Sequence, residues 1–126
     1  MATLQGESYI QTGQTVDLGT LSAPGSTDVV RMYGSKGFML QYTVATINTS
    51  VVVKAEGSVD NSSWFDLSED ESAVTKTANG TYAMLCETEV PFIRFTFVSE
   101  AGGTAATIAV LIFPLKSSFT MGGGSI

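Results

Sequence analysis

Apolar and polar residues alternate along much of the chain, which is the pattern of strands that bury one face. In residues 37–47 one face carries Phe38, Leu40, Tyr42 and Val44. Residues 50–57 alternate in the same way, and only Asn48 and Thr49 separate the two stretches. A two-residue link between alternating stretches predicts a β-hairpin.

Further strands are predicted in the second half of the chain. One run covers residues 81–86, introduced by Asn79 and Gly80. Residues 91–98 alternate well, and Pro91 stands at the start of this run, where a missing N–H does little harm. Residues 104–113 are apolar on both faces, which predicts a strand in the middle of a sheet.

Weaker strand patterns cover residues 15–21, 29–33 and 64–67, and residues 68–77 are predicted to form a loop or a single turn. About eight strands at intervals of 8–12 residues are typical of an all-β fold. We therefore predict a single antiparallel β-sandwich of jelly-roll type.

The two ends of the chain differ from the middle, so we predict three segments. Residues 1–14 form an N-terminal arm, residues 15–115 the β-sandwich domain, and residues 116–126 a C-terminal tail. Three consecutive glycines, Gly122 to Gly124, lose too much backbone entropy to become ordered without help. The tail is expected to be either disordered or ordered by a neighbouring molecule.

Charge and composition exclude several functions. Of the 126 residues 14% are charged, and 6 Lys and Arg against 12 Asp and Glu give a net charge of −6, unlike a nucleic-acid-binding protein. Histidine is absent, which removes the commonest general base and zinc ligand. The longest strongly apolar stretch, residues 105–115, is too short to span a membrane, and residues 1–14 have neither the basic region nor the apolar run expected of a signal peptide. We expect a protein that is not an enzyme and needs no cofactor.

Two groups of carboxylates have the residue types for chemistry. The acidic stretch 66–71, with Asp60 nearby, offers oxygen ligands for Ca²⁺, but its spacing differs from an EF-hand, and a solvated loop is the simpler interpretation. Glu87 and Glu89 share one face of a strand, as a glycosidase pair would, although solubilising carboxylates are expected there. Cys86, the single cysteine, is expected to be a small core residue.

Aromatic residues suggest an alternative binding site. Trp64 and Tyr82 are candidates for a platform on which a sugar ring stacks. The other interpretation is that Trp64 fills the end of the sandwich core.

The middle of the chain resembles small β-sandwich virion proteins of tailed bacteriophages. The stretch that carries the resemblance runs from Glu56 to Leu67 and reads EGSVDNSSWFDL, followed by Asn79–Tyr82, Phe92–Phe95 and Gly102–Ile108. These proteins occur as capsid decoration (cement) proteins, head fibres and tail accessories. The resemblance implies a protein on the outer surface of the capsid, bound to the major capsid protein and stabilising the shell by bridging its neighbours.

Candidate partner contacts lie at the chain ends. Tyr9 and Ile10 in the arm, and Phe119 and Met121 in the tail, are apolar residues in polar surroundings, which suggests burial against a partner or against the chain's own sandwich. A homotrimer suits pseudo-threefold positions of a capsid. The alternatives are a carbohydrate-binding or host-attachment module and a fibre or tail accessory subunit whose terminal arm donates a strand to the next copy.

Overall fold

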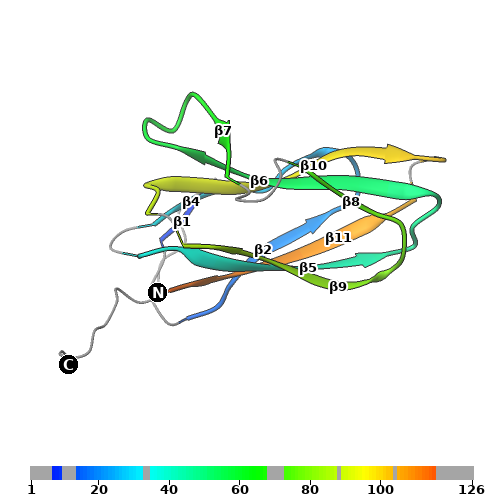
Figure 1. Ribbon diagram of the computed structural model, residues 1–126, viewed down its shortest axis with the longest axis horizontal. Coiled ribbons are helices and arrows are strands. Elements are labelled where there is room, and N and C mark those ends of the chain that lie inside the picture. The colour runs from blue at the N-terminus through cyan, green and yellow to red at the C-terminus, as the bar shows by residue number, and fades with distance from the viewer. Residues whose placement is uncertain are drawn as a thin grey trace.

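The computed structural model describes residues 7–9, 14–32, 35–67, 73–87, 89–103 and 105–115. These residues form eleven strands in two sheets packed face to face (Figure 1), and they include no helix long and apolar enough to cross a membrane. The first sheet, sheet A, contains β1 (Glu7–Tyr9), β3 (Gly25–Ser26), β4 (Val29–Arg31), β6 (Ser50–Ser58), β7 (Phe65–Asp66), β8 (Val74–Lys76) and β10 (Phe92–Ala101). The second, sheet B, contains β2 (Val16–Leu21), β5 (Phe38–Ala45), β9 (Gly80–Cys86) and β11 (Thr107–Pro114).

The strand order confirms the predicted sandwich of jelly-roll type. Sheet B has the order β2-β11-β5-β9, and the main strands of sheet A have the order β4-β10-β6-β8. Consecutive main strands thus alternate between the two sheets, except for β6 and β8, which are neighbours in sheet A, as in a jelly roll built from two Greek keys. The three short strands β1, β3 and β7 are additions to sheet A.

The predicted hairpin around Asn48 is wrong. Strand β5 pairs with β11 and β9, whereas β6 pairs with β10, β7 and β8, so the link between them crosses from sheet B to sheet A. Thr46 has a positive φ of 54°, and its Oγ1 donates to the Ala105 carbonyl at 2.7 Å. Asn48 Nδ2 donates to the Gly102 carbonyl at 2.5 Å. The turn is therefore tied to the β10–β11 connection and not to a strand partner of its own.

Two other predictions about strands have different outcomes. Strand β11 lies between β2 and β5, which confirms the central position expected from its two apolar faces. Within residues 68–77 a loop was predicted, but Val74–Lys76 forms β8 and pairs with Val51–Val53 of β6. A strand of three residues is too short to leave a readable alternation.

The core lies between the sheets and is apolar throughout. Tyr42 of β5 joins the layers, because its ring centroid lies 5.2 Å from that of Phe95 in sheet A and 5.6 Å from that of Tyr82 in sheet B. Cys86 is buried at the end of β9, as predicted. The largest fully buried side chains are Tyr42, Phe38, Phe95, Phe97, Leu40, Ile93, Ile108, Ile112, Val30, Val44, Val51 and Val53.

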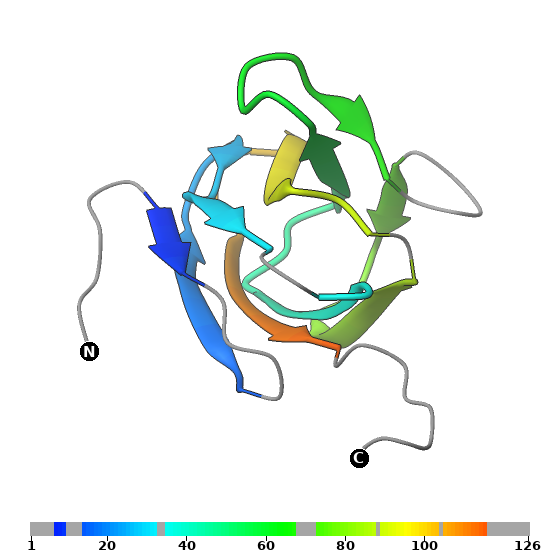
Figure 2. The ribbon, with the colours of Figure 1, turned by 90° about the vertical axis from the view of Figure 1, so that its left-hand side faces the viewer.

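The predicted N-terminal arm includes one described strand. Glu7–Tyr9 forms β1 and pairs in parallel with Val29–Arg31 of β4, whereas the other pairings are antiparallel. Figure 2 looks at the sandwich from the end where β11 finishes, and it shows β1 beside β4 and the β6–β7 connection rising above sheet A.

Candidate functional site

The outer face of sheet A carries a cluster of charged side chains centred on Glu56 of β6. Register places Glu56 opposite Arg94 of β10, and Arg94 Nε donates to Glu56 Oε1 at 2.8 Å. Thr96 Oγ1 donates to the same oxygen at 2.6 Å. Lys54 Nζ lies 3.3 Å from Glu56 Oε2 and 2.9 Å from Asp66 Oδ1 of β7. Both oxygens of Glu56 therefore have cationic partners.

The cluster is held in its charged form by its own geometry. Glu56 is only 8% exposed, and burial by itself would raise its pKa. The hydrogen bonds from Thr96 and Arg94 and the charge of Arg94 outweigh burial, so the pKa of Glu56 is lowered. The hydrogen bond to Asp66 raises the pKa of Lys54, against a smaller opposing effect of desolvation. Both shifts favour the charged forms of Glu56 and Lys54.

Trp64 completes this surface from the β6–β7 connection. The guanidinium carbon of Arg94 lies 4.2 Å from the centroid of the Trp64 ring, which is a cation–π contact. The connection itself is closed by Asp60, whose Oδ1 accepts hydrogen bonds from the backbone N–H of Ser62 at 2.9 Å and of Ser63 at 2.8 Å. These backbone hydrogen bonds lower the pKa of Asp60. The connection is therefore a structured projection and not a free coil.

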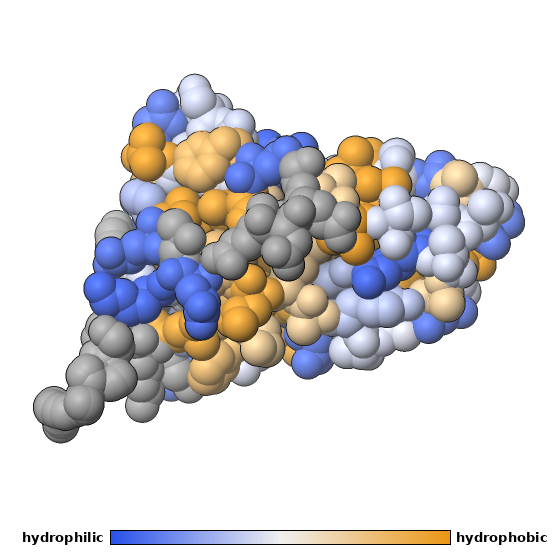
Figure 3. Space-filling model, viewed as in Figure 1, coloured by the Kyte–Doolittle hydropathy of each residue, from blue (hydrophilic) through white to orange (hydrophobic). Residues whose placement is uncertain are grey.

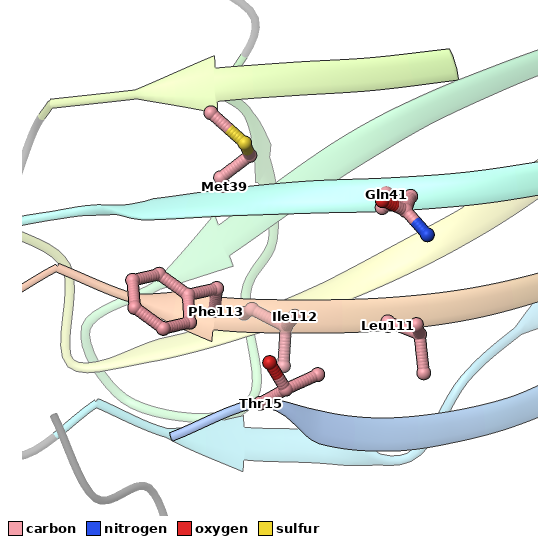
Figure 4. Close-up of a pocket in the computed structure, with 6 residues that line it drawn as sticks. All are labelled: Thr15, Met39, Gln41, Leu111, Ile112 and Phe113. Carbon is pink, nitrogen blue, oxygen red and sulfur yellow. The ribbon is translucent and has the colours of Figure 1, made fainter. Parts of the chain in front are cut away.

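The outer face of sheet B is different, because apolar residues lie there in register. Phe113 of β11 is opposite Met39 of β5, and Met39 is opposite Leu85 of β9. These three residues are 40%, 41% and 50% exposed, and we call them the apolar row. A shallow hollow of about 100 Å³ adjoins the row (Figure 4) and is lined by Thr15, Met39, Gln41, Leu111, Ile112 and Phe113.

The apolar row occupies one end of the face. Towards the other end, Thr43 and Thr81 join their hydroxyl groups across β5 and β9 at 3.0 Å. In Figure 3 apolar side chains form patches in the left and middle parts of the molecule, with hydrophilic side chains between them, while the far right-hand end is mostly polar. The row lies at the end of the sandwich where β11 finishes (Figure 1).

The predicted partner contacts fall mostly outside the described residues. Ile10, Phe119 and Met121 lie outside them, and of Tyr9 the structure describes the backbone, as part of β1. These four residues remain predicted interface positions.

The structure does not bring Trp64 and Tyr82 together. The Tyr82 ring lies against Tyr42 on the inner face of sheet B, its hydroxyl donates to the Ala78 carbonyl at 2.5 Å, and Lys76 Nζ lies 4.4 Å from its ring centroid. Trp64 lies with Arg94 on the outer face of sheet A and is not part of the buried core. The expectation that Trp64 fills the end of the core is therefore wrong.

The described carboxylates of the two predicted sites do not come together in a metal or catalytic site. Asp66 is engaged by Lys54, Asp60 caps its own turn, and residues 68–71 lie outside the described part of the chain. Glu87 and Glu89 are exposed after the end of β9. Among the residues that the structure describes, no three His, Cys, Asp or Glu side chains are grouped closely enough to hold a metal ion.

Sequence reasoning missed the apolar row. Met39 and Leu85 stand at positions where alternation predicts polar residues, so each looked like an isolated exception. A signal was present in that both are large and apolar on the solvent side of their strands, but only the register between β5, β9 and β11 puts them side by side.

Comparisons with known proteins give a likeness in fold. No protein-family model and no curated protein matches the chain. Among solved structures, the crystal structure of the SPBc2 prophage-derived protein YomS is similar, with a TM-score of 0.56 and 15% sequence identity. The match covers 79% of this chain and 89% of that chain. At this identity the likeness shows that the two chains share a fold.

Proposed function

We propose that this chain is a non-enzymatic structural protein of a tailed-phage particle, and more specifically a capsid decoration protein. The observation that carries the proposal is the sandwich fold that the chain shares, over 79% of its length, with a prophage-derived protein. The stretch from Glu56 to Leu67, which resembles virion proteins, also supports the proposal. In the structure these residues form the β6–β7 projection on sheet A.

The two outer faces suit a protein that binds a partner through a contact surface and carries out no reaction. On sheet A the charged side chains of the cluster around Glu56 are already paired with one another, so this cluster needs no ionic partner. On sheet B the apolar row offers a neutral surface, and apolar residues at the centre of a contact are typical of stable interfaces. The face of sheet B is therefore the one we assign to contacts between subunits.

The proposed mechanism is bridging on the outer capsid surface. A subunit that buries area on two neighbouring copies of the major capsid protein raises the energy needed to separate them. Stable interfaces bury about 1,600 Å² in total, and a homotrimer would multiply these contacts without new chemistry. The partner is expected to offer a neutral or basic surface, because this chain carries a net charge of −6.

The test is binding to particles that lack the protein. Particles are prepared from the phage that encodes the chain with its gene deleted, and purified protein is added in increasing amounts before sedimentation. We expect saturation at a fixed ratio to the major capsid protein and a shell that breaks at a higher temperature. Particles that take up no protein, or that take it up only on tails, would remove the capsid proposal.

A carbohydrate-binding or host-attachment module is the second candidate, and the β6–β7 projection is the observation that favours it. Phe65 is 45% exposed and follows Trp64 on this projection. The fluorescence of Trp64, the single tryptophan, reports directly on such a site. Quenching by a sugar would support the module, and an unchanged spectrum across a panel of sugars would remove it.

A further inference from the structure

We propose that the free edge of β9 accepts residues 117–121 from a second copy of this chain as an added antiparallel strand. The inference deepens the proposed function and rests on it in one respect, namely that copies of the chain meet at high density on a particle. Strand addition is an established way for an extended segment to bind a sheet edge, since the backbone supplies hydrogen bonds and alternate side chains supply specificity.

The accepting edge is unusually open for a natural protein. Strand β9 is at the end of sheet B and pairs with β5, and no described strand pairs with its other side. Its seven residues, GTYAMLC, contain no charge and no proline, although proteins usually protect long edges with such residues. The opposite edge strand, β2, is interrupted by a register shift and by Gly19, whose φ is +91°.

The edge strands of sheet A are shorter and offer fewer backbone hydrogen-bonding groups to an added strand. Strand β1 has three residues, β7 has two and β8 has three. Among the described strands, β9 is therefore the edge with the longest regular run of backbone groups available to a new strand.

The donated segment matches this edge in pattern. Residues 117–121 read SSFTM, so Phe119 and Met121 fall on one face of an extended strand. Placed beside β9 with that face outward, Phe119 lies opposite Leu85 and Met121 opposite Ala83. The apolar row Phe113, Met39 and Leu85 then continues onto a further strand, and the half-exposed Leu85 becomes covered.

The length of the tail shows why the donor is a second copy. Leu115 is held at the end of β11, because its N–H donates to the Gly37 carbonyl at 3.0 Å. Strands lie about 4.8 Å apart, so a strand added beyond β9 lies about 14 Å from β11 across the sheet. Leu115 also lies past the level of Leu85 along the strands, so the distance from Leu115 to a residue placed opposite Leu85 is about 16 Å. Four residues span at most about 14 Å when fully extended, so Phe119 does not reach the edge of its own subunit.

The test is a cross-link between two singly substituted full-length proteins. Leu85→Cys and Phe119→Cys are mixed under mild oxidation, and paired positions of an antiparallel ladder have the spacing that a disulfide requires. The matched control mixes Val98→Cys with Phe119→Cys, because Val98 is 40% exposed but lies on β10 in sheet A. We expect at least tenfold more covalent dimer from the first mixture than from the control.

A second measurement does not depend on oxidation. Light scattering over a concentration series compares the wild-type protein with Leu85→Lys, Val98→Lys and Phe119→Ser. We expect Leu85→Lys and Phe119→Ser to weaken self-association at least tenfold and Val98→Lys to leave it unchanged. Far-UV circular dichroism of Phe119→Ser, recorded on the same samples, distinguishes a loss of association from a loss of the fold.

Three results would overturn the inference: equal cross-linking in both mixtures, self-association that survives Phe119→Ser, or a disulfide within one chain of a Leu85→Cys/Phe119→Cys double variant. Failure of the cross-link with saturable capsid binding intact removes strand addition but leaves the proposed function standing. A specific cross-link without binding to any particle supports strand addition and removes the proposed function.

Discussion

Replacing Glu56 by Gln tests whether the outer face of sheet A is held by its charges. The substitution keeps the size of the side chain and removes its negative charge. Glu56 is 8% exposed and receives hydrogen bonds from Arg94 at 2.8 Å and from Thr96 at 2.6 Å. The glutamine carbonyl oxygen can still accept both of these hydrogen bonds, but their ionic part is lost, and an uncharged NH2 group replaces the carboxylate oxygen that faces Lys54.

The magnitude follows from the exposure of the partners. Hydrogen bonds to charged groups contribute about 1.5–3 kcal/mol each. The full penalty for leaving a charge unpaired in the interior is about 3–5 kcal/mol. It does not apply here, because the side chains of Lys54 and Arg94 are 24% and 27% exposed and regain water. We expect Glu56→Gln to lower the free energy of unfolding by about 2 kcal/mol.

The assay is urea unfolding followed by far-UV circular dichroism, with thermal unfolding as a second measure. A loss of about 2 kcal/mol corresponds to about 6–10 °C in Tm for a domain of this size. The control is Asp66→Asn, which breaks the ion pair of Lys54 with an exposed carboxylate and is expected to cost less than about 1 kcal/mol. If Glu56→Gln unfolds within about 0.5 kcal/mol of the wild type, the cluster does not stabilise the face as we have argued.

Three further predictions follow from particular residues. Because the folded-state pKa of Glu56 lies below its ordinary value of 4.5, its contribution is complete above that pH and is lost as the pH falls through the folded-state pKa; the wild type should therefore lose more stability than Glu56→Gln in acid unfolding curves. Gly37→Ala should strongly destabilise the protein, since a Cβ there would meet the backbone carbonyl of Cys86, and a Tm close to wild type would refute this. Cys86 is 4% exposed, so the reaction of its thiol with a thiol reagent should proceed at the rate of unfolding, and fast labelling of the native protein would contradict its burial.

The layers of the sandwich could be predicted from the sequence, but strand pairing could not. Alternation shows which side chains of a strand point inward, and Phe38, Leu40, Tyr42 and Val44 are indeed buried. It does not show to which sheet the next strand belongs. A link as short as Asn48–Thr49 fits a hairpin as well as a crossing between sheets, and the choice is made by bonds to Gly102 and Ala105, more than fifty residues away.

The candidate surfaces could be predicted less well than the layers, because they too depend on which strands pair. Alternation in residues 50–57 puts Lys54 and Glu56 on the same face of their strand, but Arg94 and Thr96 join them only through the register of β6 with β10. The apolar row likewise needs three strands from separate parts of the chain. Sites assembled across strands depend on pairing, which local pattern does not contain.

The position of β11 has a consequence for the order of folding. It is the last described strand of the chain, and it lies in the middle of sheet B between β2 and β5. Until Thr107–Pro114 has been synthesised, β2 has no partner in its sheet and the buried Ile108, Val110 and Ile112 are missing from the core. Folds dominated by such distant contacts form slowly, because loop closure costs entropy before any contact compensates for it. A chain that ends before residue 107 should remain unfolded by circular dichroism. The sandwich is therefore complete only once the residues of β11 have been synthesised and have paired with both β2 and β5.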